Sequence, residues 1–191
     1  MTVLRNPFPP QIVEEINLIV QPAIRQIKNN INVHYVNNAA TFISEEALKR
    51  KKKLHESLID TAGEETNMRN FDRFLLDIKS NAESNLFKVL AKIYDVDNIF
   101  MSGSFYYPDS GYMGWHTNHS DPSTVVYIVY ADQDQKSFFR YEDEKGKIIT
   151  DYDDKGLTIR QFELKGTKPY FWHCVGSTCN RFSFGFRIRR N

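Results

Sequence analysis

The second half of the chain is a series of short segments rich in aromatic and β-branched residues, and this pattern limits the folds open to it. Eight such segments follow Ile99 with turn residues between them: 100–107, 112–118, 124–130, 137–141, 147–150, 158–164, 169–175 and 181–188. Segments of this length and composition are typical of β-strands. Eight of them in succession favour a double-sheet barrel of the jelly-roll type.

The first half has apolar residues at spacings of three and four, which indicates amphipathic helices. Pro9-Pro10, Ser44 and the capping box Ser80-Asn81-Ala82-Glu83 each suit a helix start. Helices are expected at about 11–27, 45–62, 71–78 and 80–94, with an extended segment at 32–42. We therefore predict one α+β domain, with a helical cover over residues 1–97 and a double-stranded β-helix core over residues 98–191.

Composition excludes several classes of partner. Twenty-five basic and 24 acidic side chains give a net charge of +1, so no overall field attracts nucleic acid or an anionic membrane. No stretch reaches the roughly 18 consecutive apolar residues of a membrane span. Cys174 and Cys179 are the only cysteines, too few for a disulfide framework, so we expect a cytoplasmic protein.

Two histidines stand in strand-like segments, in the sequences Gly114-Trp115-His116-Thr117-Asn118 and Phe171-Trp172-His173-Cys174-Val175. Residues two apart in a strand share a face, so His116 and Asn118 are expected to point the same way. His173 follows 57 residues after His116 in another predicted strand, and closure of a barrel can bring distant strands to one ion. We predict that His116, Asn118 and His173 bind a metal and form the catalytic centre.

The last segment, Arg181-Phe182-Ser183-Phe184-Gly185-Phe186-Arg187, alternates strictly. Its phenylalanines should face the helices, which leaves Arg181 and Ser183 facing the interior of the barrel. A buried guanidinium needs an anion, and its planar fork suits a carboxylate, with the Ser183 hydroxyl as a further donor. Arg181 and Ser183 are therefore predicted to bind a carboxylate ligand.

With these residues the region from about Ile99 to Ile188 resembles the 2-oxoglutarate- and Fe(II)-dependent oxygenases, nearest to their small prolyl-4-hydroxylase-like members. The resemblance implies a double-stranded β-helix that holds Fe(II) through His116 and His173. It also implies that Arg181 and Ser183 bind the distal carboxylate of 2-oxoglutarate. A tyrosine on an early strand is often near the cosubstrate in this family, which makes Tyr106 or Tyr107 a candidate; we take Tyr107.

Asn118 departs from the family pattern, because a carboxylate usually follows the first histidine at this spacing. An amide oxygen can occupy the same volume but is neutral, so affinity for Fe(II) should fall. Asp121 could complete the site from the following loop, and His119 is another nearby donor. Asn118 is our preferred third ligand. Halogenation, known for members with a small residue at this place, is less favoured because the amide partly fills the vacancy.

The resemblance implies a dioxygenase that hydroxylates an aliphatic carbon and releases succinate and CO2. Its substrate, a prolyl or other protein side chain or a small molecule, is not specified by the sequence. The loop 104–113 and the acidic turn 151–155 are expected to face the substrate. The alternative is a catalytically silent jelly-roll module that binds a peptide or small carboxylate, and Asn118 is the main argument for it.

Overall fold

The computed structural model describes residues 1–4, 8–30, 39–55, 81–97, 99–118 and 122–188. The helices are α1 (Pro10–Asn30), α2 (Ala39–Ile43), α3 (Glu45–His55) and α5 (Asn81–Tyr94). The strands are β1 (Thr2–Leu4), β2 (Ile99–Tyr107), β3 (Tyr112–His116), β4 (Ser123–Ala131), β5 (Ser137–Glu142), β6 (Ile148–Tyr152), β7 (Gly156–Leu164), β8 (His173–Ser177) and β9 (Arg181–Ile188).

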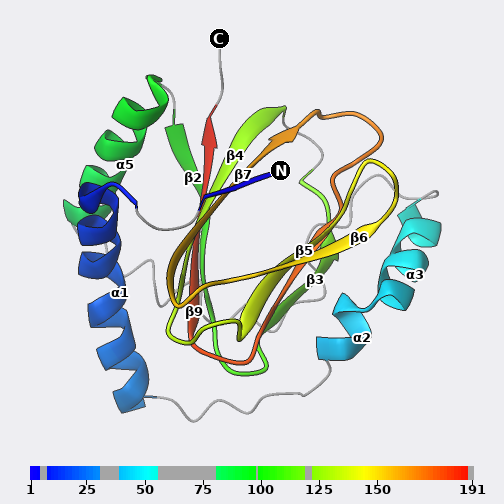
Figure 1. Ribbon diagram of the computed structural model, residues 1–191, viewed down its shortest axis with the longest axis horizontal. Helices are drawn as coiled ribbons and strands as arrows, with labels where there is room; N and C mark the ends of the chain where they lie inside the picture. The colour runs from blue at the N-terminus through cyan, green and yellow to red at the C-terminus, as the bar shows by residue number, and fades with distance from the viewer. Residues whose placement is uncertain (5–7, 31–38, 56–80, 98, 119–121, 189–191) are drawn as a thin grey trace.

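The strands form two antiparallel sheets (Figure 1). One has five strands in the order β1-β7-β4-β9-β2, and the other has four in the order β3-β8-β5-β6. From β2 to β9 the chain passes repeatedly from one sheet to the other, so most hydrogen-bonded neighbours are far apart in sequence. The two sheets face each other across a core in which Val125 and Phe162 of the larger sheet meet Phe139 and Val175 of the smaller one.

Helices cover the outer face of each sheet. Helices α1 and α5 lie beside the larger sheet, and α2 and α3 lie beside the smaller one (Figure 1). Ile12, Ile16 and Leu90 pack with the outward phenylalanines of β9. Under the second pair of helices, Trp115, Trp172 and Cys174 form a smaller core with Ala47 and Leu48. In α3, the Ser44 hydroxyl accepts a hydrogen bond from the Ala47 amide at 3.2 Å, as expected of a helix cap.

The alternation predicted for the last strand is confirmed. Phe182, Phe184 and Phe186 are buried against the helices. Ser183, Gly185 and Arg187 line a cavity between the sheets instead. Because β9 pairs with both β4 and β2, these inward residues lie inside the larger sheet and not on its edge strand.

All eight predicted strands are present, and the differences lie at their ends. Strand β3 ends at His116, before Asn118, and β8 begins at His173 rather than at Pro169. The extended segment predicted for 32–42 is wrong for residues 39–42, which belong to α2; its remainder, residues 32–38, lies outside the described residues. Strand β1 was not predicted, because a three-residue edge strand has too little pattern to stand out.

Some predictions fall on residues that the structure does not describe. The helix predicted at 71–78 and the last turns of the one predicted after Ser44 are among them. Within the described part of the chain, no helix combines the length and the apolarity that crossing a bilayer requires. The predicted one-domain organisation stays a prediction.

Candidate metal centre

The three predicted metal ligands lie together between the sheets. His116 ends β3 and His173 begins β8, and the antiparallel pairing of these strands sets the two residues opposite each other. Their ring centroids are 4.1 Å apart. Asn118 Nδ2 lies 3.4 Å from His173 Nε2. We call His116, Asn118 and His173 the histidine cluster.

Backbone carbonyls orient both imidazole rings in the same way. His116 Nδ1 lies 2.8 Å from the Gly114 carbonyl oxygen, and His173 Nδ1 lies 3.1 Å from that of Phe171. A carbonyl can only accept, so each Nδ1 carries the proton and each Nε2 keeps its lone pair. Metal-binding histidines are commonly held through such a hydrogen bond from the other ring nitrogen. Both rings therefore present Nε2 as a potential ligand.

Burial keeps the two imidazoles neutral. Desolvation lowers the pKa of His116 to about 4, against a smaller opposing effect of its hydrogen bond to Gly114. Desolvation also lowers the pKa of His173 well below its usual value, and the neighbouring His116 lowers it further. At neutral pH neither ring needs to lose a proton before it binds a metal.

Asn118 is held by a tyrosine from the opposite sheet. Its Nδ2 donates to the Tyr127 hydroxyl oxygen at 3.2 Å. A rotation of the amide by half a turn exchanges Oδ1 and Nδ2 with little change of shape, which would turn the oxygen toward the histidines. In that orientation the Tyr127 hydroxyl can donate to the amide, so the contact survives. An oxygen ligand is thus available beside the two Nε2 atoms.

All three residues line one cavity of about 200 Å³. Its volume is below the roughly 300–1,000 Å³ of pockets that take drug-sized ligands, so it suits a small molecule. Tyr107 and Ser183, both predicted to bind the cosubstrate, line it as well. Tyr106, the alternative to Tyr107, points to the other face of the sheet, where its ring packs against Phe182 and its hydroxyl donates to Asn180 Oδ1 at 2.7 Å.

Arg181 is fully buried but is not among the residues that line this cavity. Its guanidinium lies 4.8 Å over the ring of Tyr107, which does line the cavity. Its Nε donates to Asp153 Oδ2 at 2.9 Å. Its two terminal nitrogens, Nη1 and Nη2, are buried and have no hydrogen-bond partner in the part of the chain that the structure describes.

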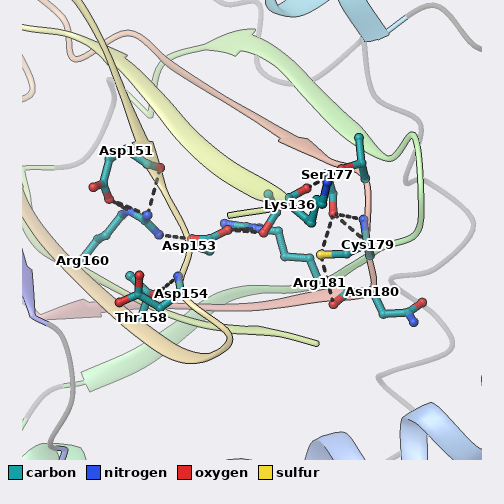
Figure 2. Close-up of polar contacts among 12 residues, drawn as sticks. Lys136, Asp151, Asp153, Asp154, Thr158, Arg160, Ser177, Cys179, Asn180 and Arg181 are labelled. Atoms are coloured by element: carbon teal, nitrogen blue, oxygen red, sulfur yellow. Dashed lines mark hydrogen bonds and ion pairs between the residues drawn. The ribbon is translucent and has the colours of Figure 1, made fainter. Parts of the chain in front are cut away.

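The anion that Arg181 requires is thus supplied in part by the protein itself. Asp153 lies between two guanidinium groups, those of Arg160 and Arg181 (Figure 2). We call these three residues the arginine cluster. Burial would raise the pKa of Asp153, but Arg181 and then Arg160 outweigh it and lower that pKa to about 2. The carboxyl is therefore ionised at neutral pH.

In the acidic turn 151–155, which was expected to face the substrate, two acids are held by arginines of the protein instead. Asp153 is fully buried, and Asp151 accepts hydrogen bonds from Arg160. The sequence carried a signal that was not used: Arg160 stands in an apolar strand, where it too needs a buried partner. Sequence reasoning also missed Arg187, which lines the cavity of the histidine cluster.

A second cavity, of about 290 Å³, shares the lining residue Asn118 with the first. Its wall includes Phe171, Tyr170 and four acidic residues: Glu142, Asp143, Glu144 and Glu163. Lys52 and Lys165 form ion pairs with Glu142 and Glu144, respectively. A molecule in this second cavity would lie next to the Asn118 side of the histidine cluster.

The three candidate ligands could hold a divalent metal, but none of them carries a negative charge. Within the described ranges, no three or more His, Cys, Asp or Glu side chains are arranged so that they could hold a metal ion together. Two neutral imidazoles and one amide oxygen are suitable ligands for iron but carry no negative charge. The two alternative third ligands, Asp121 and His119, lie outside the described residues.

No protein-family model and no curated protein matches this sequence. Among solved structures, a Pseudomonas putida prolyl-4-hydroxylase aligns over 99% of this chain and 92% of its own, with a TM-score of 0.50 and 10% identity. A Burkholderia pseudomallei oxidoreductase of the 2OG-Fe(II) oxygenase family aligns over 88% of each chain, with a TM-score of 0.39 and 12% identity. The first likeness establishes a shared fold, and at this identity it establishes nothing further.

Proposed function

We propose that the protein is a 2-oxoglutarate- and Fe(II)-dependent dioxygenase with a double-stranded β-helix core. It would hydroxylate an aliphatic carbon of a protein side chain or small molecule. One oxygen atom of O2 would enter the product and the other the succinate that is released with CO2. The observation that carries the proposal is the pair of imidazoles whose Nε2 atoms keep their lone pairs, beside an amide and inside a cavity suited to a small molecule.

His116 and His173 would hold the iron through Nε2, and Asn118 through Oδ1. Bound iron, with 2-oxoglutarate and O2, supplies the oxidising chemistry. The protein would contribute by fixing the imidazole rings of His116 and His173 through hydrogen bonds to backbone carbonyls. The two rings are then already oriented before iron binds. Burial contributes as well, because it keeps water away from the reacting atoms.

Tyr107, Ser183 and Arg181 would orient the cosubstrate. Tyr107 and Ser183 line the cavity, and Arg181 adjoins it through the Tyr107 ring. The unpaired Nη1 and Nη2 of Arg181 support its role as the donor to a distal carboxylate. An unsatisfied buried donor costs about 1–3 kcal/mol, and a ligand carboxylate would remove that cost.

The second cavity supports a place for the primary substrate. Because Asn118 lines both cavities, a molecule in the second would lie beside a proposed metal ligand. The acidic and aromatic side chains in the wall of that cavity are better suited to contact part of a protein chain than to bind O2 or the anionic 2-oxoglutarate. The fold likeness to a prolyl-4-hydroxylase supports the same substrate class by analogy only.

The rival function is a catalytically silent module that binds a peptide or small carboxylate. The uncharged Asn118 and the absence of a third acidic, cysteine or histidine ligand among the described residues favour it. Against it, two oriented imidazoles would then be buried for no purpose, at a cost in stability.

The deciding experiment is conversion of 2-oxoglutarate to succinate by the purified protein with Fe(II) and O2, without any added substrate. The dioxygenase should show slow uncoupled turnover and, under anaerobic conditions, a weak visible charge-transfer band with Fe(II) and 2-oxoglutarate. His173→Ala should abolish both. A wild-type protein that shows neither signal, while remaining folded, is the silent module.

A paired substitution identifies the third ligand. If Asn118 is that ligand, Asn118→Ala should weaken Fe(II) binding and Asp121→Ala should leave it unchanged. The opposite result assigns the third ligand to Asp121 and rejects Asn118.

A further inference from the structure

The carboxylate of Asp153 divides its two oxygens between two arginines. Oδ1 accepts from Arg160 Nη1, while Oδ2 accepts from Arg181 Nε and from the Ser137 hydroxyl. Arg160 is held from its other side by Asp151, which accepts from Nε at 2.7 Å. Figure 2 shows Asp153 between the two guanidinium groups. All three members of the arginine cluster have no exposed surface.

This division explains why Arg181 keeps two free donors. An arginine and a carboxylate usually pair through two parallel hydrogen bonds, which would occupy both oxygens of the acid. Here Arg160 occupies Oδ1, so Asp153 can give Arg181 only Oδ2. The single bond to Nε fixes the plane of the guanidinium, and the face of Tyr107 at 4.8 Å limits its tilt. Nη1 and Nη2 are left oriented and unpaired among the described residues.

We propose that Asp153, with Oδ1 held by Arg160, is a positioning residue that presents Nη1 and Nη2 of Arg181 to the distal carboxylate of the 2-oxoacid cosubstrate. This inference rests on the proposed function and adds to it an origin for cosubstrate selectivity. A five-carbon dicarboxylate gains two charge-assisted hydrogen bonds from this arrangement. A 2-oxoacid of the same length without the second carboxylate gains none and leaves both donors unpaired.

The test measures equilibrium binding of 2-oxoglutarate and of 2-oxopentanoate, which lacks the distal carboxylate, by calorimetry with the Fe(II)-loaded protein under anaerobic conditions. The quantity of interest is the ratio of the two dissociation constants, which requires no turnover. Two variants disturb the position of Arg181 without changing the net charge of the arginine cluster. Asp153→Glu displaces the carboxylate by one methylene, and Asp153→Asn combined with Arg160→Gln removes one charge of each sign.

In both variants the preference for 2-oxoglutarate should fall by about tenfold or more, because a hydrogen bond to a charged group contributes about 1.5–3 kcal/mol. The binding of 2-oxopentanoate should change little. Asp151→Asn is the matched control: it removes an acid from Arg160 but leaves Asp153 and Arg181 in contact, so the preference should be retained.

Three results would overturn the inference. One is an unchanged preference in both Asp153 variants, and another is an equal loss of affinity for both acids, which indicates a merely structural role. In both cases wild-type binding of 2-oxoglutarate leaves the proposed function standing. The third is a folded wild type that binds Fe(II) but neither acid, which rejects the proposed function together with the inference. If one Asp153 variant does not fold, the other decides.

Discussion

The histidine cluster and the arginine cluster are both buried between the two sheets, yet burial has opposite consequences for them. In the histidine cluster the nearby titratable groups are the other imidazole and cations, which add to desolvation and outweigh the backbone hydrogen bonds, so the pKa values fall and the rings are neutral. In the arginine cluster two guanidinium groups overcome desolvation, and Asp153 stays charged. Burial favours the neutral form in both clusters, and the sign of the neighbouring charges accounts for the difference between them.

The two clusters also offer opposite halves of a binding site. The histidine cluster offers acceptors, the Nε2 lone pairs, and these suit a cation. The arginine cluster offers donors, Nη1 and Nη2 of Arg181, and these suit an anion. A chelating 2-oxoacid with a second carboxylate is a ligand that can use both. The comparison therefore predicts that each cluster can be disabled separately.

The largest effect is expected from the histidine cluster. His173→Ala should weaken Fe(II) binding by more than about 100-fold, since loss of even an outer hydrogen-bond partner of a metal ligand costs about 10–100-fold. Anaerobic titration with Fe(II) measures it. Asp151→Asn, a change beside the other cluster, serves as the control and should bind Fe(II) normally. Equal weakening in both variants would mean that the two clusters do not act separately.

Arg181→Lys should raise the 2-oxoglutarate concentration needed for half-maximal binding by about 10–100-fold, with Fe(II) binding unchanged. Lysine keeps the charge beside Asp153 but lacks the planar fork. Arg187→Lys, on the same face of β9, is the comparison variant, because Arg187 lines the cavity directly. A larger loss in Arg187→Lys than in Arg181→Lys would transfer the carboxylate contact to Arg187.

Much of this arrangement could be predicted from local sequence pattern. The alternation in Arg181-Phe182-Ser183 fixes which side chains face the helices, and the two-residue spacing of His116 and Asn118 places both in one cavity. The partner of Arg181 could not be predicted in the same way. The alternation of side chains along the strand predicts that the guanidinium of Arg181 is buried. It does not predict which of several acidic residues forms an ion pair with it. That depends on where the chain passes from β6 of the smaller sheet to β7 of the larger one, a long-range property of the fold.

The stability of the arginine cluster should depend on pH in acid. Asp153 has a pKa of about 2 in the folded protein and about 4 when unfolded, so its contribution is complete above pH 4 and is lost as the pH falls toward 2. The loss is on the order of 2 kcal/mol. Urea unfolding of the wild type between pH 5 and pH 2 should show this decline, and the Asp153→Asn, Arg160→Gln double variant should show a shallower one. Parallel curves would mean that the carboxyl of Asp153 is not held ionised by its arginines.

The smallest expected effect is on Fe(II) affinity when a negative charge is added to the histidine cluster. Asn118→Asp should tighten Fe(II) binding by about tenfold, because a carboxylate attracts a divalent cation more strongly than an amide and can still accept from the Tyr127 hydroxyl. Asn118→Leu, which removes the polar atoms at nearly the same volume, should weaken binding. If Asp and Leu at this position bind Fe(II) equally, residue 118 does not contact the metal. The two-histidine site would then be completed by a residue other than Asn118, and the division between a neutral and a charged cluster would no longer account for the metal affinity.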